Sequence, residues 1–373
     1  MTPMVNFCYC LRTSLFLLLS MVLHHAGYGQ QAIVIGEKQR IHSELLDMER
    51  EIWIGLPKSY GDTLYSKRDY PVLYFFDGDS QFETFVAQRN WLSRNLYSAL
   101  PEFIVVGILH RDRARELTPT AMETPENWKR ANFSTSGGNA AFMQFVEEEL
   151  KPYIDTNYRT NGFEILSGHS FGGLAVAHAL IDRPESFDAY IAIDPSVWWD
   201  DNGLLNRMGD SWYGPQYDGK IFFLAKADDP GSGDHHHSAI LEFHEKLKAL
   251  GENKKLDWKY HFYQGEDHGS VLVPSVFDAL RFIFKGYQMP VKEAMKDPGV
   301  LHGHFDGLSK RLGYTVLADE RLIDEMARVC VRQSLYRQAA ELLALNLKNY
   351  PDSPHAQERH LEFIQAHKGE LEH

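Results

Sequence analysis

Short, nearly all-apolar runs alternate with longer amphipathic stretches between residues 70 and 287, and this alternation constrains the fold most strongly. The run YPVLYFF (Tyr70–Phe76) is typical of a strand that is buried on both faces. The stretch GGNAAFMQFVEEELKPYI repeats its apolar residues every three or four positions, which favours a helix. Such alternation predicts an α/β fold with a mostly parallel sheet and helices on both faces. Further strands are expected at residues 103–109, 163–166, 189–194, 220–227 and 256–263.

The two flanking regions depart from this alternation. Residues 32–57 alternate charged and apolar side chains, which predicts two antiparallel strands. Residues 289–373 show only helical patterning. One repeat does not make an array, so a helical appendage packed on the α/β core is favoured over a module that contacts a partner protein. The positions that match a tetratricopeptide-type helix pair are Tyr336, Ala339, Leu343, Leu347 and Pro351.

The first 29 residues have the layout of a secretory signal peptide. Arg12 precedes the apolar run SLFLLLSMVL, small residues follow in HHAGYG, and a cut is expected after Gly29. A membrane anchor is the alternative, but the run is shorter than the roughly 20 residues that a span needs. We therefore expect a signal peptide at 1–29, an α/β domain at 30–288 and a helical, tetratricopeptide-like region at 289–373. The mature protein would be secreted or periplasmic, without stable membrane insertion.

Composition excludes some classes of function. Hydrophobic residues make up 44% of the 373 residues, which is enough for a large core. The net charge of -13 argues against nucleic acid as a main partner. Cys330 is the one cysteine of the sequence beyond residue 29, so a function based on a pair of thiols or on a zinc–thiolate site is disfavoured.

The pattern Gly168-His169-Ser170-Phe171-Gly172 lies between an expected strand and an expected helix. This is the context in which a nucleophilic serine sits on a tight turn, with glycines at Gly168 and Gly172 because side chains there would clash. A glycine-rich phosphate loop is the structural alternative. It is disfavoured because no lysine follows the glycines at the spacing that such a loop requires.

A nucleophilic serine on such a turn needs a base and an acid, in the order Ser, acid, His along the chain. His268 follows the last expected strand and precedes a helix, which is the place of the base. The acid is expected after the preceding strand, where Asp229 is the first candidate and Asp228 the alternative; both could also be ordinary turn residues. The adjacent histidines 235–237 could not all face one ion from a regular helix or strand, so we expect no metal and no cofactor.

Two backbone amides should complete the site by stabilising the oxyanion. One belongs to Phe171, the residue after the serine, and the other to Asp79 in the loop after Tyr70–Phe76. Gly78 permits the tight turn that would aim the Asp79 amide inward. Removing one such donor typically costs ~2.7–4 kcal/mol of transition-state stabilisation.

Several segments together resemble the esterase branch of the α/β-hydrolases that includes esterase D, the enterobactin-type siderophore esterases and the mycolyltransferases. The resemblance covers residues 32–287 and implies Ser170 as nucleophile, His268 as base, and Phe171 and Asp79 as oxyanion donors. It leaves the choice between Asp229 and Asp228 open, because the acid varies within the branch. The segments that carry the resemblance are YPVLYFFDGDSQF, GGNAAFMQFVEEELKPYIDTNYRT, SGHSFGG, AIDPSVWWD and GEDHGSV.

Three further residues are candidates for substrate contact. Trp198 and Trp199 match an aromatic pair that the family often carries beside the nucleophile, although plain packing explains large aromatic residues equally well. Arg113, with Arg115, lies on the loop after residues 103–109 and could hold an anionic group, although a solvated charged loop is the commoner arrangement.

The sequence therefore predicts a serine esterase that cleaves a small-molecule ester through an acyl-enzyme. Siderophore lactones, acylated sugars and simple short-chain esters all remain open as substrates. One alternative is acyl transfer, thioester hydrolysis or peptide cleavage on the same triad. Another is a non-catalytic binding protein that uses its helical C-terminus.

Overall fold

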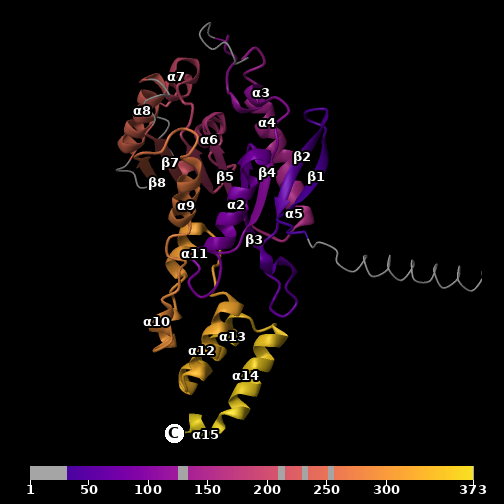
Figure 1. Ribbon diagram of the computed structural model, residues 1–373, viewed down its shortest axis with the longest axis vertical. Helices are drawn as coiled ribbons and strands as arrows, with labels where there is room; N and C mark the ends of the chain where they lie inside the picture. Colours follow the sequence, from indigo (N-terminus) through magenta and orange to yellow (C-terminus); the bar gives the residue numbers. More distant parts are fainter. Residues whose placement is uncertain (1–31, 125–132, 209–214, 229–233, 251–255, 373) are drawn as a thin grey trace, which may run out of the picture. The chain divides into compact units, whose positions relative to one another are not determined.

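The computed structural model describes residues 32–124, 133–208, 215–228, 234–250 and 256–372. Eight strands form one sheet in the order β1-β2-β4-β3-β5-β6-β7-β8 (Figure 1). Strands β3 to β8 pair in parallel with one another, whereas β2 pairs antiparallel with both β1 and β4. The strands are β1 (Glu37–Ser43), β2 (Met48–Gly55), β3 (Tyr70–Phe76), β4 (Ile104–Ile108), β5 (Thr160–His169), β6 (Ala189–Ile193), β7 (Ile221–Ala227) and β8 (Asp257–Tyr263).

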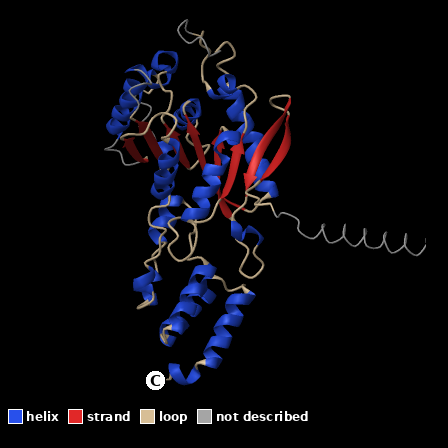
Figure 2. Cartoon of the chain, viewed as in Figure 1, coloured by secondary structure: helices blue, strands red, loops and turns tan. Residues whose placement is uncertain are grey.

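Helices occupy the connections between the parallel strands, and helices joined by loops make up the described chain after α9, as Figure 2 shows by colour. A π-helical turn, Val146–Leu150, joins α4 to α5. The helices are α2 (Gly78–Leu92), α3 (Arg113–Leu117), α4 (Asn139–Phe145), α5 (Lys151–Asn157), α6 (Phe171–Asp182), α7 (Trp199–Asn206), α8 (Asp234–Leu250), α9 (Leu272–Ile283), α10 (Val291–Ala294), α11 (Asp306–Leu312), α12 (Glu320–Arg332), α13 (Tyr336–Asn349), α14 (Pro354–Ala366) and α15 (Lys368–Leu371).

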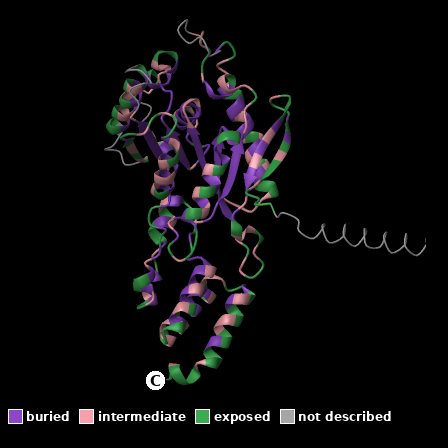
Figure 3. Ribbon diagram, in the orientation of Figure 1, coloured by how far each residue is buried: buried purple, intermediate pink, exposed green. Residues whose placement is uncertain are grey.

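Both faces of the sheet are covered, and strand β3 shows why its sequence is apolar throughout. Leu73 and Phe75 belong to the core that the sheet forms with α2 and α9. Their neighbours Val72, Tyr74 and Phe76 point the other way, into the core formed with α4, α6 and α8. All seven residues of β3 are buried, and the central strands are buried along their length in Figure 3. The predicted α/β fold, with a mostly parallel sheet and helices on both faces, is confirmed.

The helices after residue 288 pack on the same core as α9. Apolar side chains of α12 and α13, among them Ile323, Met326 and Leu342, belong to the cluster that contains Leu280 and Ile283 of α9. Cys330 is buried in α12, where burial raises the pKa of its thiol. Whether this region acts as a tetratricopeptide-like module stays a prediction. In the residues that the structure describes, no helix is both long and apolar enough to cross a membrane.

Candidate active site

Ser170 lies on a sharp turn between the end of β5 and the start of α6. Its backbone has φ 60° and ψ −117°, a strained conformation that residues other than glycine rarely adopt. The turn is held because the Ser170 amide donates to the Ile193 carbonyl at 3.0 Å and the Ser196 amide donates to the Ser170 carbonyl at 3.0 Å. This is the strand–turn–helix context in which an α/β-hydrolase exposes its nucleophile.

The glycines around Ser170 differ in how closely their neighbours approach. A Cβ at Gly168 would lie 2.3 Å from the carbonyl carbon and oxygen of Gly172, and one at Gly173 would lie 2.9 Å from Pro195 Cα. A Cβ at Gly172 itself would meet Phe76 at 3.4 Å, which is an ordinary contact. The predicted clash is therefore confirmed at Gly168 and wrong at Gly172, whose backbone is the surface that Gly168 touches.

His268 lies in the connection between β8 and α9, as predicted from its position after the last strand. Its Nδ1 is 2.6 Å from Oδ2 of Asp194, and its side chain is 35% exposed. A carboxylate only accepts, so the neutral ring carries its proton on Nδ1 and keeps a lone pair on Nε2. Nε2 is therefore the nitrogen that remains for proton transfer.

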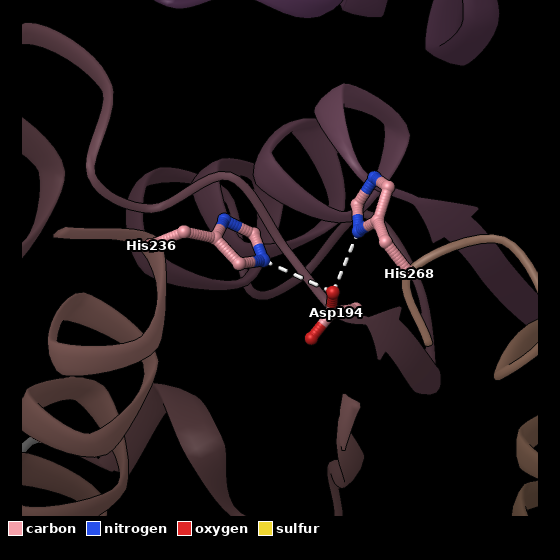
Figure 4. Close-up of side chains that lie close together, drawn as sticks. All are labelled: Asp194, His236 and His268. Carbon is pink, nitrogen blue, oxygen red and sulfur yellow. Dashed lines mark hydrogen bonds and ion pairs between the residues drawn. The ribbon is translucent and has the colours of Figure 1, made fainter. Parts of the chain in front are cut away.

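Asp194 directly follows β6 and is the carboxylate on which the site converges. Its backbone turns through φ 40°, and its amide donates to the Ala225 carbonyl at 2.9 Å. Oδ1 accepts from the Ala227 amide at 2.9 Å, while Oδ2 accepts from His236 Nε2 at 3.0 Å as well as from His268 (Figure 4). Burial opposes ionisation, but the hydrogen bonds from His236 and His268 hold the pKa of Asp194 well below its usual range.

The structure differs here from the sequence prediction of the acid. The partner of His268 is Asp194, and Asp228 accepts instead from the Gly265 amide at 3.2 Å. Asp229 lies outside the described residues. The prediction placed the acid after β7, whereas Asp194 follows β6, the strand next to β5, at a residue with positive φ. The run AYIAID ends in Asp194. A carboxylate at the carboxyl end of a predicted strand was the sequence signal that could have identified it.

Two more polar groups beside Ser170 were not found from the sequence. Ser170 Oγ lies 3.4 Å from Ser196 Oγ, and no hydrogen bond within the described part of the chain joins Ser170 to His268. The His169 ring packs on His268 with 4.5 Å between ring centroids. Burial, reinforced by the neighbouring His268, lowers the pKa of His169 to about 4, so this ring is neutral at neutral pH.

The predicted oxyanion donors both lie in the first turn of a helix, where amides lack intrahelical acceptors. Phe171 is the first residue of α6 and Asp79 the second of α2. A Cβ at Gly78 would lie 2.6 Å from the Gly107 carbonyl carbon, so glycine lets the start of α2 approach β4. Asp77 precedes this turn with φ 56°, and its amide donates to His110 Nε2 at 3.2 Å.

The three residues predicted to contact substrate lie in different environments. Arg113 binds Asp77 in a bidentate ion pair, with Nε–Oδ1 at 2.6 Å and Nη2–Oδ2 at 2.9 Å, so its charge is balanced by that carboxylate. Trp199 is 1% exposed and donates from Nε1 to the Thr120 carbonyl at 3.1 Å, as a packing residue would. Trp198 is half-buried beside Phe171, at 6.4 Å between ring centroids.

The histidines 235–237 lie at the start of α8 and point to different environments. His235 is exposed, His237 is half-buried, and His236 is buried against Asp194. The expectation that the three would not converge on one point is therefore confirmed. The helix nevertheless brings one of them, His236, into the site.

Comparison with known proteins identifies the family of the chain. Residues 43–281, more than half of the chain, match the family model described as "Putative esterase". The ferri-bacillibactin esterase BesA of Bacillus subtilis is 30% identical over 236 residues, which cover 57% of this chain and 78% of BesA. A siderophore triacetylfusarinine C esterase of Aspergillus fumigatus is also 30% identical, but the match covers only 54% of that protein and 42% of this chain.

A solved structure extends the likeness beyond the sheet. An IroE-like serine hydrolase from Shewanella oneidensis superposes with a TM-score of 0.73 at 31% identity, covering 84% of this chain and 99% of its own. Residues 1–288 make up 77% of the 373-residue chain, which is less than the 84% that the superposition covers. The likeness therefore extends into the C-terminal helices. The chain therefore belongs to this esterase family of the α/β-hydrolase superfamily, and it is a carboxylic ester hydrolase.

Proposed function

We propose that this hydrolase works through an acyl-enzyme on Ser170, with His268 as the base and Asp194 as the acid. The observation that carries the proposal is the strained turn at Ser170 together with a histidine whose Nδ1 is held 2.6 Å from a buried carboxylate. A nucleophile on a sharp turn and a base fixed by an acid are the two arrangements that activate a serine.

The steps follow from the protonation states. Nε2 of His268 takes the Ser170 proton as Oγ attacks the ester carbonyl, and the imidazolium then gives the proton to the departing alcohol. The buried Asp194 anion stabilises that imidazolium and fixes the ring. Water hydrolyses the acyl-enzyme with the same base, and the amides of Phe171 and Asp79 receive the oxyanion in both halves of the reaction.

The missing Ser170–His268 hydrogen bond fits this scheme. Bonds between nucleophile and base are often long before substrate binds and tighten in the Michaelis complex. Ser170 Oγ lies 3.4 Å from Ser196 Oγ. In this scheme it moves away from the Ser196 hydroxyl when it turns towards His268.

Serine-to-alanine variants test the assignment of the nucleophile. Ser170→Ala should reduce hydrolysis of p-nitrophenyl butyrate at least ~1,000-fold, because the attacking oxygen is removed. Ser196→Ala, the matched control 3.4 Å away, should keep most of the activity. A Ser170→Ala enzyme that retains wild-type turnover would contradict the proposal.

We propose further that the ester belongs to a siderophore. This rests on the relatives, since BesA is named a ferri-bacillibactin esterase and the Aspergillus fumigatus relative a siderophore esterase. The half-buried Trp198 and Phe171 beside Ser170 are suited to an aromatic substrate group. The test compares kcat/KM for a tricatecholate trilactone with that for p-nitrophenyl acetate. A preference for the simple ester would contradict this substrate class.

We also propose that residues 1–29 are removed and that the enzyme works outside the cytoplasm. The charged residue, apolar run and small residues of this segment support it. N-terminal sequencing of the mature protein should begin at Gln30. An intact Met1 in exported protein would contradict cleavage.

A further inference from the structure

We propose that Asp194, His236 and His268 form a binding site for a borderline divalent cation such as Zn²⁺, and that its occupation reversibly switches off the esterase. The inhibitory part of this proposal rests on His268 being the base. The binding part rests on the three side chains alone and is tested separately.

The three ligating groups come together from three separate elements. Asp194 follows β6, His236 lies in the first turn of α8, and His268 lies between β8 and α9. One ligand atom from each lies within 4.8 Å of the others. In Figure 4 both rings direct a nitrogen at the same carboxylate oxygen, so no element has to move far for one ion to replace the two hydrogen bonds.

The ligand types and their surroundings suit zinc. Two imidazoles and one carboxylate are a ligand set of zinc sites that keep a fourth position open. Asp194 and His236 are 1% and 8% exposed, whereas the His268 side chain is 35% exposed. The other oxygen of Asp194 is held by the Ala227 amide, as supporting hydrogen bonds orient the ligands of metal sites.

Metal binding disables the base through the tautomer of His268. In the hydrogen-bonded cluster the ring carries its proton on Nδ1 and the lone pair on Nε2. A cation on Nδ1 needs the lone pair of that nitrogen, so the proton moves to Nε2 of the same ring. Nε2–H cannot accept the Ser170 proton, and catalysis stops with no change in the net number of protons.

This mechanism predicts the kinetic form of the inhibition. The cation lies behind His268, on the side of Asp194 and not where the ester binds. Zn²⁺ should therefore lower kcat without changing KM, and a chelator should restore the rate. Mg²⁺ and Ca²⁺ should not inhibit at the same concentration, because they prefer sets of oxygen ligands.

Binding is measured by calorimetric titration of Zn²⁺ into the Ser170→Ala protein, which keeps all three ligands and requires no turnover. One site should appear in this protein, and it should be weakened at least ~10-fold when His236→Gln is added, since losing even a supporting group of a metal site costs that much. Equal affinity in the two proteins would overturn the proposed site.

Inhibition is then compared in His236→Gln and His235→Gln, each relative to its own metal-free rate. His235 is the matched control because it is the exposed neighbour on the same turn. The Zn²⁺ concentration for half-inhibition should rise at least ~10-fold in His236→Gln and stay at the wild-type value in His235→Gln. The same value in all three proteins would overturn the switch, whereas turnover by Ser170→Ala would overturn only the proposed nucleophile.

Discussion

At Asp194 a single side chain that is 1% exposed accepts three hydrogen bonds, one from the Ala227 amide and two from histidines. Such a carboxylate stays ionised because its charge is solvated by donors that do not have to reorganise. In the proposed mechanism a fixed anion stands beside the ring that must become positive. Asp194 would then have two tasks, orienting His268 and stabilising its charged form.

The acid can be identified by comparing two aspartates. Asp194→Asn should lower kcat by roughly 10³–10⁴-fold, because an amide no longer stabilises the imidazolium and allows the wrong tautomer. Asp228→Asn should stay near wild type, because Asp228 contacts the Gly265 amide and not His268. Steady-state kinetics on p-nitrophenyl butyrate measure both, and the opposite ranking would refute Asp194 as the acid.

The site residues differ in how far the sequence could identify them. The positions of Ser170 and His268 in the fold were predictable because each is marked locally, by glycines around a strand–helix turn and by a place after the last strand. Asp194 was not, because the partner of His268 depends on which loop reaches it in space. Asp194 has positive φ, and no local sequence pattern predicts that conformation or the contact with His268.

Among the elements, the turn between β5 and α6 shows most directly how backbone geometry positions Ser170. The last residues of β5 and the first turn of α6 approach so closely that a single methyl group at Gly168 would overlap the Gly172 backbone. The strain at Ser170 is therefore sustained by packing on both sides of the turn. Alternating strands and helices made the elements predictable, whereas such close approaches follow only from how they pack.

Gly168→Ala should destabilise the protein by ~1–3 kcal/mol, as overpacking in a core does, and should lower activity by displacing Ser170. Gly307→Ala is the control, because a Cβ at this exposed position of α11 meets nothing within 4 Å. It should change stability by less than about 1 kcal/mol, in the stabilising direction. Urea denaturation measures both, and equal effects would refute the close-packed turn.

A buried ion pair between Arg50 and Glu116 links strand β2 to helix α3. Arg50 donates to both oxygens of Glu116 at 2.7 and 2.9 Å, and His110 Nδ1 lies 2.9 Å from Glu116 Oε2. Burial alone would raise the pKa of Glu116, but the hydrogen bonds from His110 and Arg50 outweigh it and lower the pKa to about 2. Because His110 also accepts from the Asp77 amide, this pair supports the start of α2.

The lowered pKa gives a pH-dependent stability. The unfolded pKa is near 4.5 and the folded pKa about 2, so the stabilisation is complete above pH 4.5 and is lost as pH falls towards 2. The difference in unfolding free energy between wild type and Glu116→Gln should therefore shrink by about 3 kcal/mol across that window. Denaturation at several pH values measures it, and a constant difference would contradict the lowered pKa.

For the whole molecule, the helices after α9 belong to the same folding unit as the sheet. Ser66 donates from its amide to Glu320 at 2.8 Å, and Tyr65 donates to the buried Asp324 at 3.1 Å. Arg68 forms ion pairs with Glu102 and with Asp319 at the start of α12. Helical patterning predicted these helices, but the partners on residues 65–68 could not be predicted because nothing local marks them.

Arg68→Ala should lower the unfolding free energy by about 3 kcal/mol, because Glu102 and Asp319, 8% and 6% exposed, would lose their cation. Arg337→Ala removes an exposed arginine that pairs with Glu341 and should change stability by less than about 1 kcal/mol.

Unfolding of the wild-type protein should be one transition when followed by far- and near-ultraviolet circular dichroism. Two separate transitions in wild type would refute the single unit.

The claim that Ser170 is an activated nucleophile is tested most directly by covalent labelling. The wild-type protein should gain the mass of one fluorophosphonate adduct, and peptide mapping should place it on Ser170. Ser170→Ala should gain none, while Ser196→Ala should react like wild type. An adduct on another residue, or no adduct on folded wild-type protein, would contradict the account.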